Sequence, residues 1–351
     1  MKKGRNILFA IAAMGMAFVS CGVVLLALDV YLHSRLQNVG AVNIWGYRGP
    51  TIGRKQANET RLVVLGGSTA FGYGLPWNES FPYYLDGMLN ARAASGRSYR
   101  VVNLGAPAQG ALGFRVDLAD YAYLHYDAAI LYEGYNDLGA TDLPDAVPPR
   151  YAPNDLLWRR QSPIFRAAGY FPVLPLVFHE KAMVLMSGGN LDAAYRGHVE
   201  FRPGIAVRVA AGALRATAAT ADFTGAAIDR VTGDSSVAAQ SSASALDTTT
   251  WRTYTDRVLA AVRYAREHSV RVMVVTQPYA TNSHIAQQRA LAEALRMAFG
   301  GDAGVQYVNL GSSIDLKDRS VAYDGLHLVA KGNERIAGLL VEPALELTAV
   351  P

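Results

Sequence analysis

Five short apolar runs set the hydrophobic pattern of the chain, at residues 62–65, 100–104, 128–132, 270–276 and 305–310. Runs of this length, rich in β-branched residues, are typical of strands buried on both faces of a parallel sheet. Between and after them, apolar residues recur at helical spacing over residues 81–94, 112–124, 251–268, 285–299 and 329–347. Strands that alternate with helices predict an α/β fold in which helices cover both faces of a parallel sheet.

A longer apolar run without charges covers residues 7–28 and follows three basic residues at the N-terminus. A helix of this length spans roughly 33 Å, which matches a bilayer core. We therefore expect an uncleaved signal anchor over residues 1–35, with the rest of the chain outside the inner membrane, in the periplasm or cell exterior. A cleaved signal peptide and lipid attachment at Cys21 remain alternatives. Residues 36–60, polar and glycine-rich, are predicted to connect the anchor to the domain.

The α/β pattern is interrupted over residues 140–250, so the main domain is predicted to consist of residues 61–139 and 251–351. Within the insertion, residues 165–186 are apolar but broken by prolines, and are too interrupted to span a bilayer. A lid over a site, a face resting on the membrane and an ordinary packed subdomain all fit this segment. Residues 210–250 are rich in Ala, Ser and Thr, which predicts loosely held helix or partial disorder.

Composition excludes several functional classes. The formal net charge is +4, and three of the basic residues precede the apolar run, so the body is nearly neutral and lacks the charge of a nucleic-acid surface. A single cysteine excludes an intramolecular disulfide and a cysteine-based metal site. The glycine-rich stretch 66–74 fits neither a phosphate-binding loop nor a dinucleotide fingerprint nor a G-x-S-x-G elbow, and no histidines have metal-ligand spacing. We expect no cofactor, no metal and no nucleic-acid partner.

Candidate catalytic residues lie after three of the predicted strands, and a further pair lies just before the last predicted helix. Ser68 comes after the first run, Gly105 ends the second, and Asn136 follows the third within Gly-Tyr-Asn-Asp. Asp324 stands three residues before His327 in a late loop. Open α/β sheets bind ligands outside the carboxyl ends of their strands, so these residues are expected to meet at one edge.

In this order, the four blocks resemble those of the SGNH (GDSL-like) hydrolase family, over residues 61–136 and 251–345. The resemblance implies a flavodoxin-like three-layer α/β/α sandwich of about five parallel strands. Here the anchor helix and a largely helical insertion would be added to it. One departure is that the first block of the family commonly reads Gly-Asp-Ser, whereas this chain reads Gly66-Gly67-Ser68.

The resemblance assigns Ser68 as nucleophile, His327 as base and Asp324 as the group that orients the histidine. The residue types suit this chemistry, because a serine hydroxyl is a weak nucleophile and needs a base that a third group holds in the right tautomer. Among the other histidines, His284 is the one rival base, since it opens a helix after the fourth strand.

An oxyanion formed on the substrate needs hydrogen-bond donors placed in advance. The family resemblance assigns the backbone N–H of Ser68, the N–H of Gly105 and the side-chain amide of Asn136. Asp137 is expected to cap the next helix and to have no catalytic role.

The sequence thus predicts a serine esterase that hydrolyses carboxylic esters and binds the membrane through residues 7–28. The family resemblance implies O-acetyl esters of cell-envelope or exported polysaccharide as substrates. Three alternatives remain: an O-acetyltransferase with the same triad, a lipid-ester hydrolase, and a non-catalytic scaffold that binds a glycan or a partner through the insertion.

Overall fold

The structure is a computed structural model, and it describes residues 2–36, 42–107, 109–138, 163–175, 177 and 250–349. The expectation of loose helix or disorder over residues 210–250 lies outside the described residues, apart from Thr250. Most of the predicted insertion also lies outside them.

Five parallel strands form one sheet, which confirms the predicted fold class. They are β1 (Glu59–Gly66), β2 (Ser98–Asn103), β3 (Ala128–Glu133), β4 (Arg271–Thr276) and β5 (Val305–Asn309). Their spatial order is β2-β1-β3-β4-β5. This is the flavodoxin-like order. From β1, the chain adds β2 on one side and β3, β4 and β5 on the other, so the order of strand addition reverses between β1 and β3.

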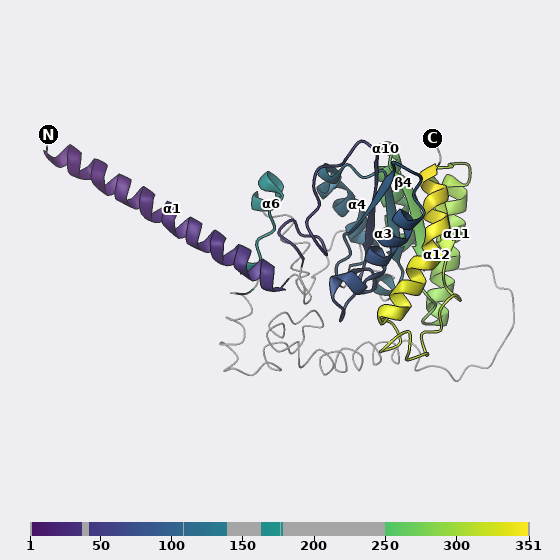
Figure 1. The fold of residues 1–351 in the computed structure, drawn as a ribbon. Coiled ribbons are helices and arrows are strands. Elements are labelled where there is room, and N and C mark those ends of the chain that lie inside the picture. The colour runs from purple at the N-terminus through teal and green to yellow at the C-terminus, as the bar shows by residue number, and fades with distance from the viewer. Residues whose placement is uncertain are drawn as a thin grey trace.

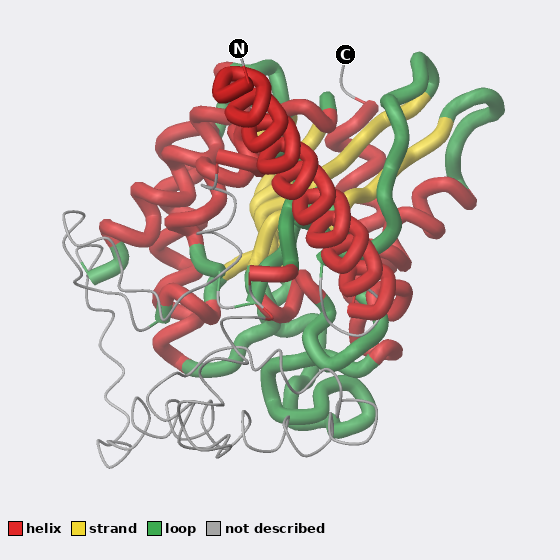
Figure 2. The backbone as a smooth tube through the Cα atoms, turned by 90° about the vertical axis from the view of Figure 1, so that its left-hand side faces the viewer, coloured by secondary structure: helices red, strands yellow, loops and turns green. Residues whose placement is uncertain are grey.

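Helices cover both faces of the sheet, as Figures 1 and 2 show. One face carries α3 (Phe81–Ala91) and α12 (Ala330–Ala349), and the other carries α4 (Ala111–Asp120), α10 (Arg252–Glu267) and α11 (Asn282–Phe299). A hydrophobic core lies on each face of the sheet. Alternate residues of each strand belong to one core or the other, because successive side chains in a strand point to opposite faces.

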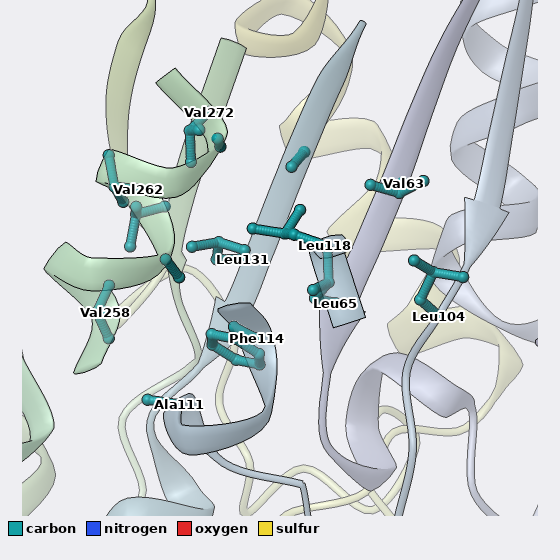
Figure 3. Packing of buried hydrophobic residues seen from close by; sticks show 14 of the residues in the cluster. Val63, Leu65, Leu104, Ala111, Phe114, Leu118, Leu131, Val258, Val262 and Val272 are labelled. Carbon is teal, nitrogen blue, oxygen red and sulfur yellow. The ribbon is translucent and has the colours of Figure 1, made fainter. Parts of the chain in front are cut away.

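In β1, Val63 and Leu65 pack with Phe114 of α4 and Val258 of α10 (Figure 3), whereas Leu62 and its neighbour two residues on pack beneath α3 and α12. The strand is therefore buried on both faces, as its continuous apolar sequence predicts.

One predicted helix is shorter than expected. The pattern over residues 112–124 is divided into α4, which ends at Asp120, and a 3₁₀ turn, η2 (Ala122–Leu124). Tyr121 lies at the break, fully buried, and donates its hydroxyl to Gly46 O at 2.6 Å. A tertiary hydrogen bond to the connector therefore accompanies a break that the periodicity alone does not show.

The N-terminal helix α1 (Lys2–Leu36) projects from the sandwich (Figure 1). Within it, Phe9–Leu36 is long and apolar enough to cross a membrane, and its most apolar 18-residue stretch has a mean hydropathy of 2.4 and is not buried inside the protein. This helix fits a membrane anchor, although a signal sequence has the same length and composition.

The C-terminal end of α1 is attached to the chain that follows α6 (Pro163–Ala168). Asp29 accepts hydrogen bonds from the backbone N–H groups of Val173 at 2.9 Å and Leu174 at 2.5 Å. His33 Nε2 lies 2.7 Å from Phe171 O. The described part of the insertion therefore packs against the end of the predicted anchor.

The connector is held against the edge of the sandwich. Tyr47 is 1% exposed, and its hydroxyl accepts the N–H of Ile52 at 2.8 Å. Arg48 donates its backbone N–H to Asn103 O at 2.9 Å and its guanidinium to Leu75 O at 2.7 Å. Burial lowers the pKa of Arg48 to about 10. The connector is thus part of the folded domain and reaches the segment that follows Ser68.

Candidate active site

The turn after β1 brings Ser68 to the edge of the sheet. Ser68 opens the short helix α2 (Ser68–Phe71), directly after Gly66 and Gly67. A Cβ on Gly66 would lie 2.3 Å from Tyr132 O, and one on Gly67 would lie 2.0 Å from Asn136 Nδ2. Both glycines are therefore needed because the neighbouring strand and turn approach their backbone too closely for a side chain. The half-buried Ser68 lies at the point where the strand order reverses, the place where such sheets bind ligands.

Ser68, His327 and Asp324 form a line of hydrogen bonds. Ser68 Oγ lies 2.7 Å from His327 Nε2, and His327 Nδ1 lies 2.6 Å from Asp324 Oδ2. With Nδ1 carrying its proton toward the carboxylate, Nε2 is free to accept the proton of the serine hydroxyl. The structure therefore brings together the serine, histidine and carboxylate that the sequence singled out.

The surroundings of Asp324 favour the ionised form of its carboxyl group. Burial would raise its pKa, but hydrogen bonds from the His327 side chain and from the backbone N–H groups of His327 and Leu326 outweigh burial and hold the pKa below its ordinary value. An ionised Asp324 stabilises a positive charge on the imidazole and fixes its tautomer.

Two tyrosines that the sequence did not single out pack against the ring of His327. The ring of Tyr323 stacks on it, with centroids 5.8 Å apart and an interplanar angle of 15°, and the ring of Tyr73 lies 5.4 Å away. Tyr323 also donates its hydroxyl to Tyr73 O at 3.0 Å, which ties the loop of His327 to the segment after Ser68. The one signal in the sequence is that Tyr323 directly precedes Asp324.

Two hydrogen-bond donors lie beside Ser68. As the first residue of a helix, Ser68 has a backbone N–H with no intrahelical acceptor. Asn136, in the 3₁₀ turn η3 (Tyr135–Asp137), donates one N–H of its amide to Gln109 O at 2.9 Å. An amide nitrogen carries two hydrogens, so a second remains to be donated. The position of that nitrogen over Gly67 places it next to the serine.

The N–H of Gly105, the third donor in the prediction, has an acceptor within the protein. Its N–H is donated to Asn103 Oδ1 at 2.9 Å, and the amide of Asn103 in turn donates to Ala70 O at 2.9 Å. A Cβ on Gly105 would lie 2.7 Å from Phe71 N. Gly105 and Asn103 therefore support the helix that carries Ser68. A polar Asn103 at the end of an apolar run was the signal that the sequence offered for this role.

Asp137 caps the start of an earlier helix, whereas the helix expected directly after it lies outside the described residues. Its Oδ2 accepts the N–H of Ala111 at 2.9 Å, at the start of the earlier helix α4, and Gly110 leaves room for this approach. Burial raises the pKa of Asp137 to about 6, although the bond from Ala111 and the charge of Arg257 oppose it. This carboxylate faces the helix N-terminus, where negative charge is favourable.

His284, the rival base, is buried beneath the turn that carries Asn136. It is 0% exposed, and its ring packs against Tyr135 with centroids 5.0 Å apart. Burial lowers its pKa to about 4. Its Nε2 would lie 2.5 Å from a Cβ on Gly134, a residue with a φ of 140° that a side chain rarely adopts. His284 therefore supports the turn and takes no part in the line of hydrogen bonds at Ser68.

Within the described residues, no group of three His, Cys, Asp or Glu side chains is arranged to hold a metal ion. The polar groups at this edge of the sheet are a hydroxyl, an imidazole, a carboxylate and two amide donors. Together they can activate a nucleophile and stabilise an oxyanion.

Comparison with known proteins gives a consistent but distant likeness. No protein-family model and no curated protein matches the sequence. Among solved structures, the chain is similar to a member of the lipolytic protein G-D-S-L family from Veillonella parvula, with 9% identity, a TM-score of 0.41 and coverage of 81% of this chain and 97% of the other.

Two carbohydrate-active structures are equally distant. A family 3 carbohydrate esterase from Clostridium thermocellum has 11% identity and a TM-score of 0.40, covering 84% of this chain and 100% of that one. An acetyl xylan esterase from Geobacillus stearothermophilus has 13% identity and a TM-score of 0.41, covering 84% and 96%. Likeness at this level does not establish a shared activity, so the function must be argued from the geometry around Ser68.

Proposed function

We propose that this chain is a membrane-anchored serine esterase of the SGNH (GDSL-like) type, with Ser68, His327 and Asp324 as its catalytic triad. The observation that carries the proposal is the pair of contacts of 2.7 Å and 2.6 Å that join the hydroxyl, the imidazole and the carboxylate. Ser68 lies near the start of the domain sequence, and Asp324 and His327 lie near its end. An ion pair between Asp324 and His327 alone would not require a serine hydroxyl next to the imidazole.

In the proposed reaction, Ser68 Oγ attacks the carbonyl carbon of an ester and its proton passes to His327 Nε2. Asp324 stabilises the imidazolium that results. The carbonyl oxygen becomes an oxyanion, held by the Ser68 N–H and the Asn136 amide. Electrostatic stabilisation of this kind is commonly the largest contribution to catalysis in acyl transfer.

The intermediate collapses when the bond from the carbonyl carbon to the alcohol oxygen breaks, and His327 returns its proton to that oxygen. A water molecule then attacks the acyl-serine ester, and His327 takes the proton of the water. The bond from the acyl carbon to Ser68 Oγ breaks, His327 returns the proton to that oxygen, and the acid and the free Ser68 hydroxyl are released. The reaction consumes one ester and one water and yields one alcohol and one acid.

We further propose that the substrates are O-acetyl esters of envelope or exported polysaccharide, and that the domain faces the periplasm or cell exterior. The support is the family resemblance of the sequence blocks and the apolar helix α1, which would keep the site near the membrane. In this proposal residues 1–35 are the anchor, 36–60 the connector, 61–139 with 251–351 the hydrolase domain, and 140–250 the insertion.

The deciding experiment labels the full chain, in detergent micelles, with a fluorophosphonate probe that reacts with activated serines. The wild type should be labelled, and Ser68→Ala should lose the label completely. Ser320→Ala is the matched control, since Ser320 is an exposed serine in the loop before His327, and it should be labelled like the wild type. Equal labelling of the wild type and Ser68→Ala, or none of either, would rule out the proposed nucleophile.

A second experiment separates hydrolysis from transfer and defines the acyl group. With an activated acetyl ester, a hydrolase releases free acetate, whereas a transferase produces acetylated sugar when an oligosaccharide is added. Nitrophenyl acetate should be turned over faster than the long-chain esters. Preference for long acyl chains would instead indicate a lipid-ester hydrolase.

A further inference from the structure

The buried carboxamide of Gln277 connects the two turns that carry the proposed oxyanion donors. Gln277 follows directly after β4 and is 1% exposed. Its Nε2 donates to Thr69 Oγ1 at 2.7 Å, and its Oε1 accepts the backbone N–H of Tyr135 at 2.9 Å. Thr69 is the residue after Ser68, and Tyr135 is the residue before Asn136.

The sheet itself stops short of these donors. In the pairing of β1 with β3, the last paired residues are Gly66 and Tyr132. Beyond this pair, the two turns leave the sheet, and the spacing between Ser68 and Asn136 depends on contacts other than the strand ladder. A single planar group that bonds both turns is suited to fix that spacing, because the donor and acceptor of one carboxamide are held rigidly relative to each other.

The end of β4 also holds Tyr135 at a second point. The hydroxyl of Tyr135 donates to Pro278 O at 2.5 Å, and the ring packs against His284. Gln277 therefore holds the turn that carries Asn136 through the backbone N–H of Tyr135, and Pro278 holds it through the side chain of Tyr135. Through its hydrogen bond to Thr69, Gln277 also holds the turn that carries Ser68.

We propose that Gln277 is a positioning residue that sets the distance between the Ser68 N–H and the Asn136 amide. The proposal rests on the proposed function, since it concerns the oxyanion site of that reaction. Gln277 does not touch the reacting atoms. It acts through Thr69 and Tyr135, and its loss should weaken binding of the transition state while leaving binding of the ester ground state nearly unchanged.

The test removes the bond from each side in the full-length protein. Gln277→Met keeps the shape of the side chain without its polar atoms, and Thr69→Val removes the acceptor hydroxyl at nearly constant volume. Thr69→Ser is the conservative variant that keeps the hydroxyl. Gln288→Met is the matched control, because Gln288 is a buried glutamine of the neighbouring helix whose bonds go to Tyr254, Gln287 and Thr276.

We expect Gln277→Met and Thr69→Val each to lower kcat about 10- to 100-fold toward nitrophenyl acetate, with KM within about twofold of the wild type. Inhibition by a boronic acid, whose serine adduct is tetrahedral, should weaken by a similar factor. Thr69→Ser should restore kcat to within about threefold of the wild type. The double variant of Gln277 and Thr69 should be no slower than the slower single variant, because Gln277→Met already removes the bond to Thr69 that Thr69→Val removes.

A merely structural role predicts a different pattern, which Gln288→Met should show: a lower melting temperature with kcat and boronic-acid inhibition unchanged. Should Gln277→Met fail to fold, Thr69→Val carries the test. A kcat within twofold of the wild type in Thr69→Val, or fully additive losses in the double variant, would overturn the role of Gln277 alone. A wild type that neither hydrolyses esters nor reacts with the fluorophosphonate would instead overturn the proposed function, and this role with it.

Discussion

Replacing Glu133 by Gln should remove a strong pH dependence from the stability of the protein. Glu133 is the last residue of β3 and is 2% exposed. The hydroxyl of Tyr254 donates to its Oε2, and Oε1 has no hydrogen-bond partner within the described residues. Burial raises the pKa of Glu133 from 4.5 to about 8, and the bond from Tyr254 opposes this only in part. The native state therefore holds this carboxyl in its protonated form at neutral pH.

The sign and size of the effect follow from linkage. Between pH 4.5 and about pH 8, the native state binds a proton at Glu133 that the unfolded chain has released. The free energy of unfolding must then fall as pH rises, by about 1.4 kcal/mol for each pH unit. From pH 5 to pH 7 the loss is about 3 kcal/mol. It vanishes below pH 4.5, where both states are protonated, and stops growing above pH 8, where both are ionised.

Glutamine at position 133 cannot ionise and still offers an oxygen to Tyr254. The difference in unfolding free energy between Glu133→Gln and the wild type should therefore rise by about 3 kcal/mol from pH 5 to pH 7. Asp137 is also buried, with a pKa raised to about 6, but it is present in both proteins and cancels in the difference. Glu293→Gln, at an exposed position on α11, is the control and should leave the slope unchanged.

The measurement is urea unfolding of the full chain in detergent micelles, followed by tryptophan fluorescence at several pH values from 5 to 9. Parallel pH profiles for the wild type and Glu133→Gln would refute the reasoning, because they would show that Glu133 carries no extra proton in the native state.

Three further changes test the candidate site and the anchor. Asn136→Ala should lower kcat by about 100-fold, or about 3 kcal/mol of barrier, with little change in KM, whereas the surface variant Asn90→Ala should match the wild type in steady-state kinetics. Asp324→Asn should lower kcat by about 10⁴-fold, because the imidazole loses both its tautomer and the charge that stabilises it; a loss below tenfold would argue against an orienting carboxylate. Asp29→Ala removes the acceptor of two backbone N–H groups at the end of α1, so limited proteolysis should cut residues 163–175 faster while turnover of a short ester stays the same.

At the edge of the sheet, the sequence predicted which residues are present but not which hydrogen bonds they make. Ser68, Asp324 and His327 could be singled out because each stands at a predictable place, after a strand or before the last helix, and because their chemistry is specific. Gly105 was assigned as an oxyanion donor by the family resemblance, and in the structure its N–H is bonded to Asn103. A motif reports which residue is present, and it does not report which acceptor already occupies its hydrogen.

The sequence by itself determined the strands, the helices, the apolar N-terminal segment and the edge at which the polar residues gather. These follow from periodicity, strand length and the position of residues at strand ends, all of which are local properties. Only the tertiary structure decided how Ser68 and Asn136 are spaced, that Tyr73 and Tyr323 pack against His327, and that Gln277 bonds both turns. These depend on side chains from segments far apart in the sequence, and packing and hydrogen bonding fix them only after the sheet has assembled.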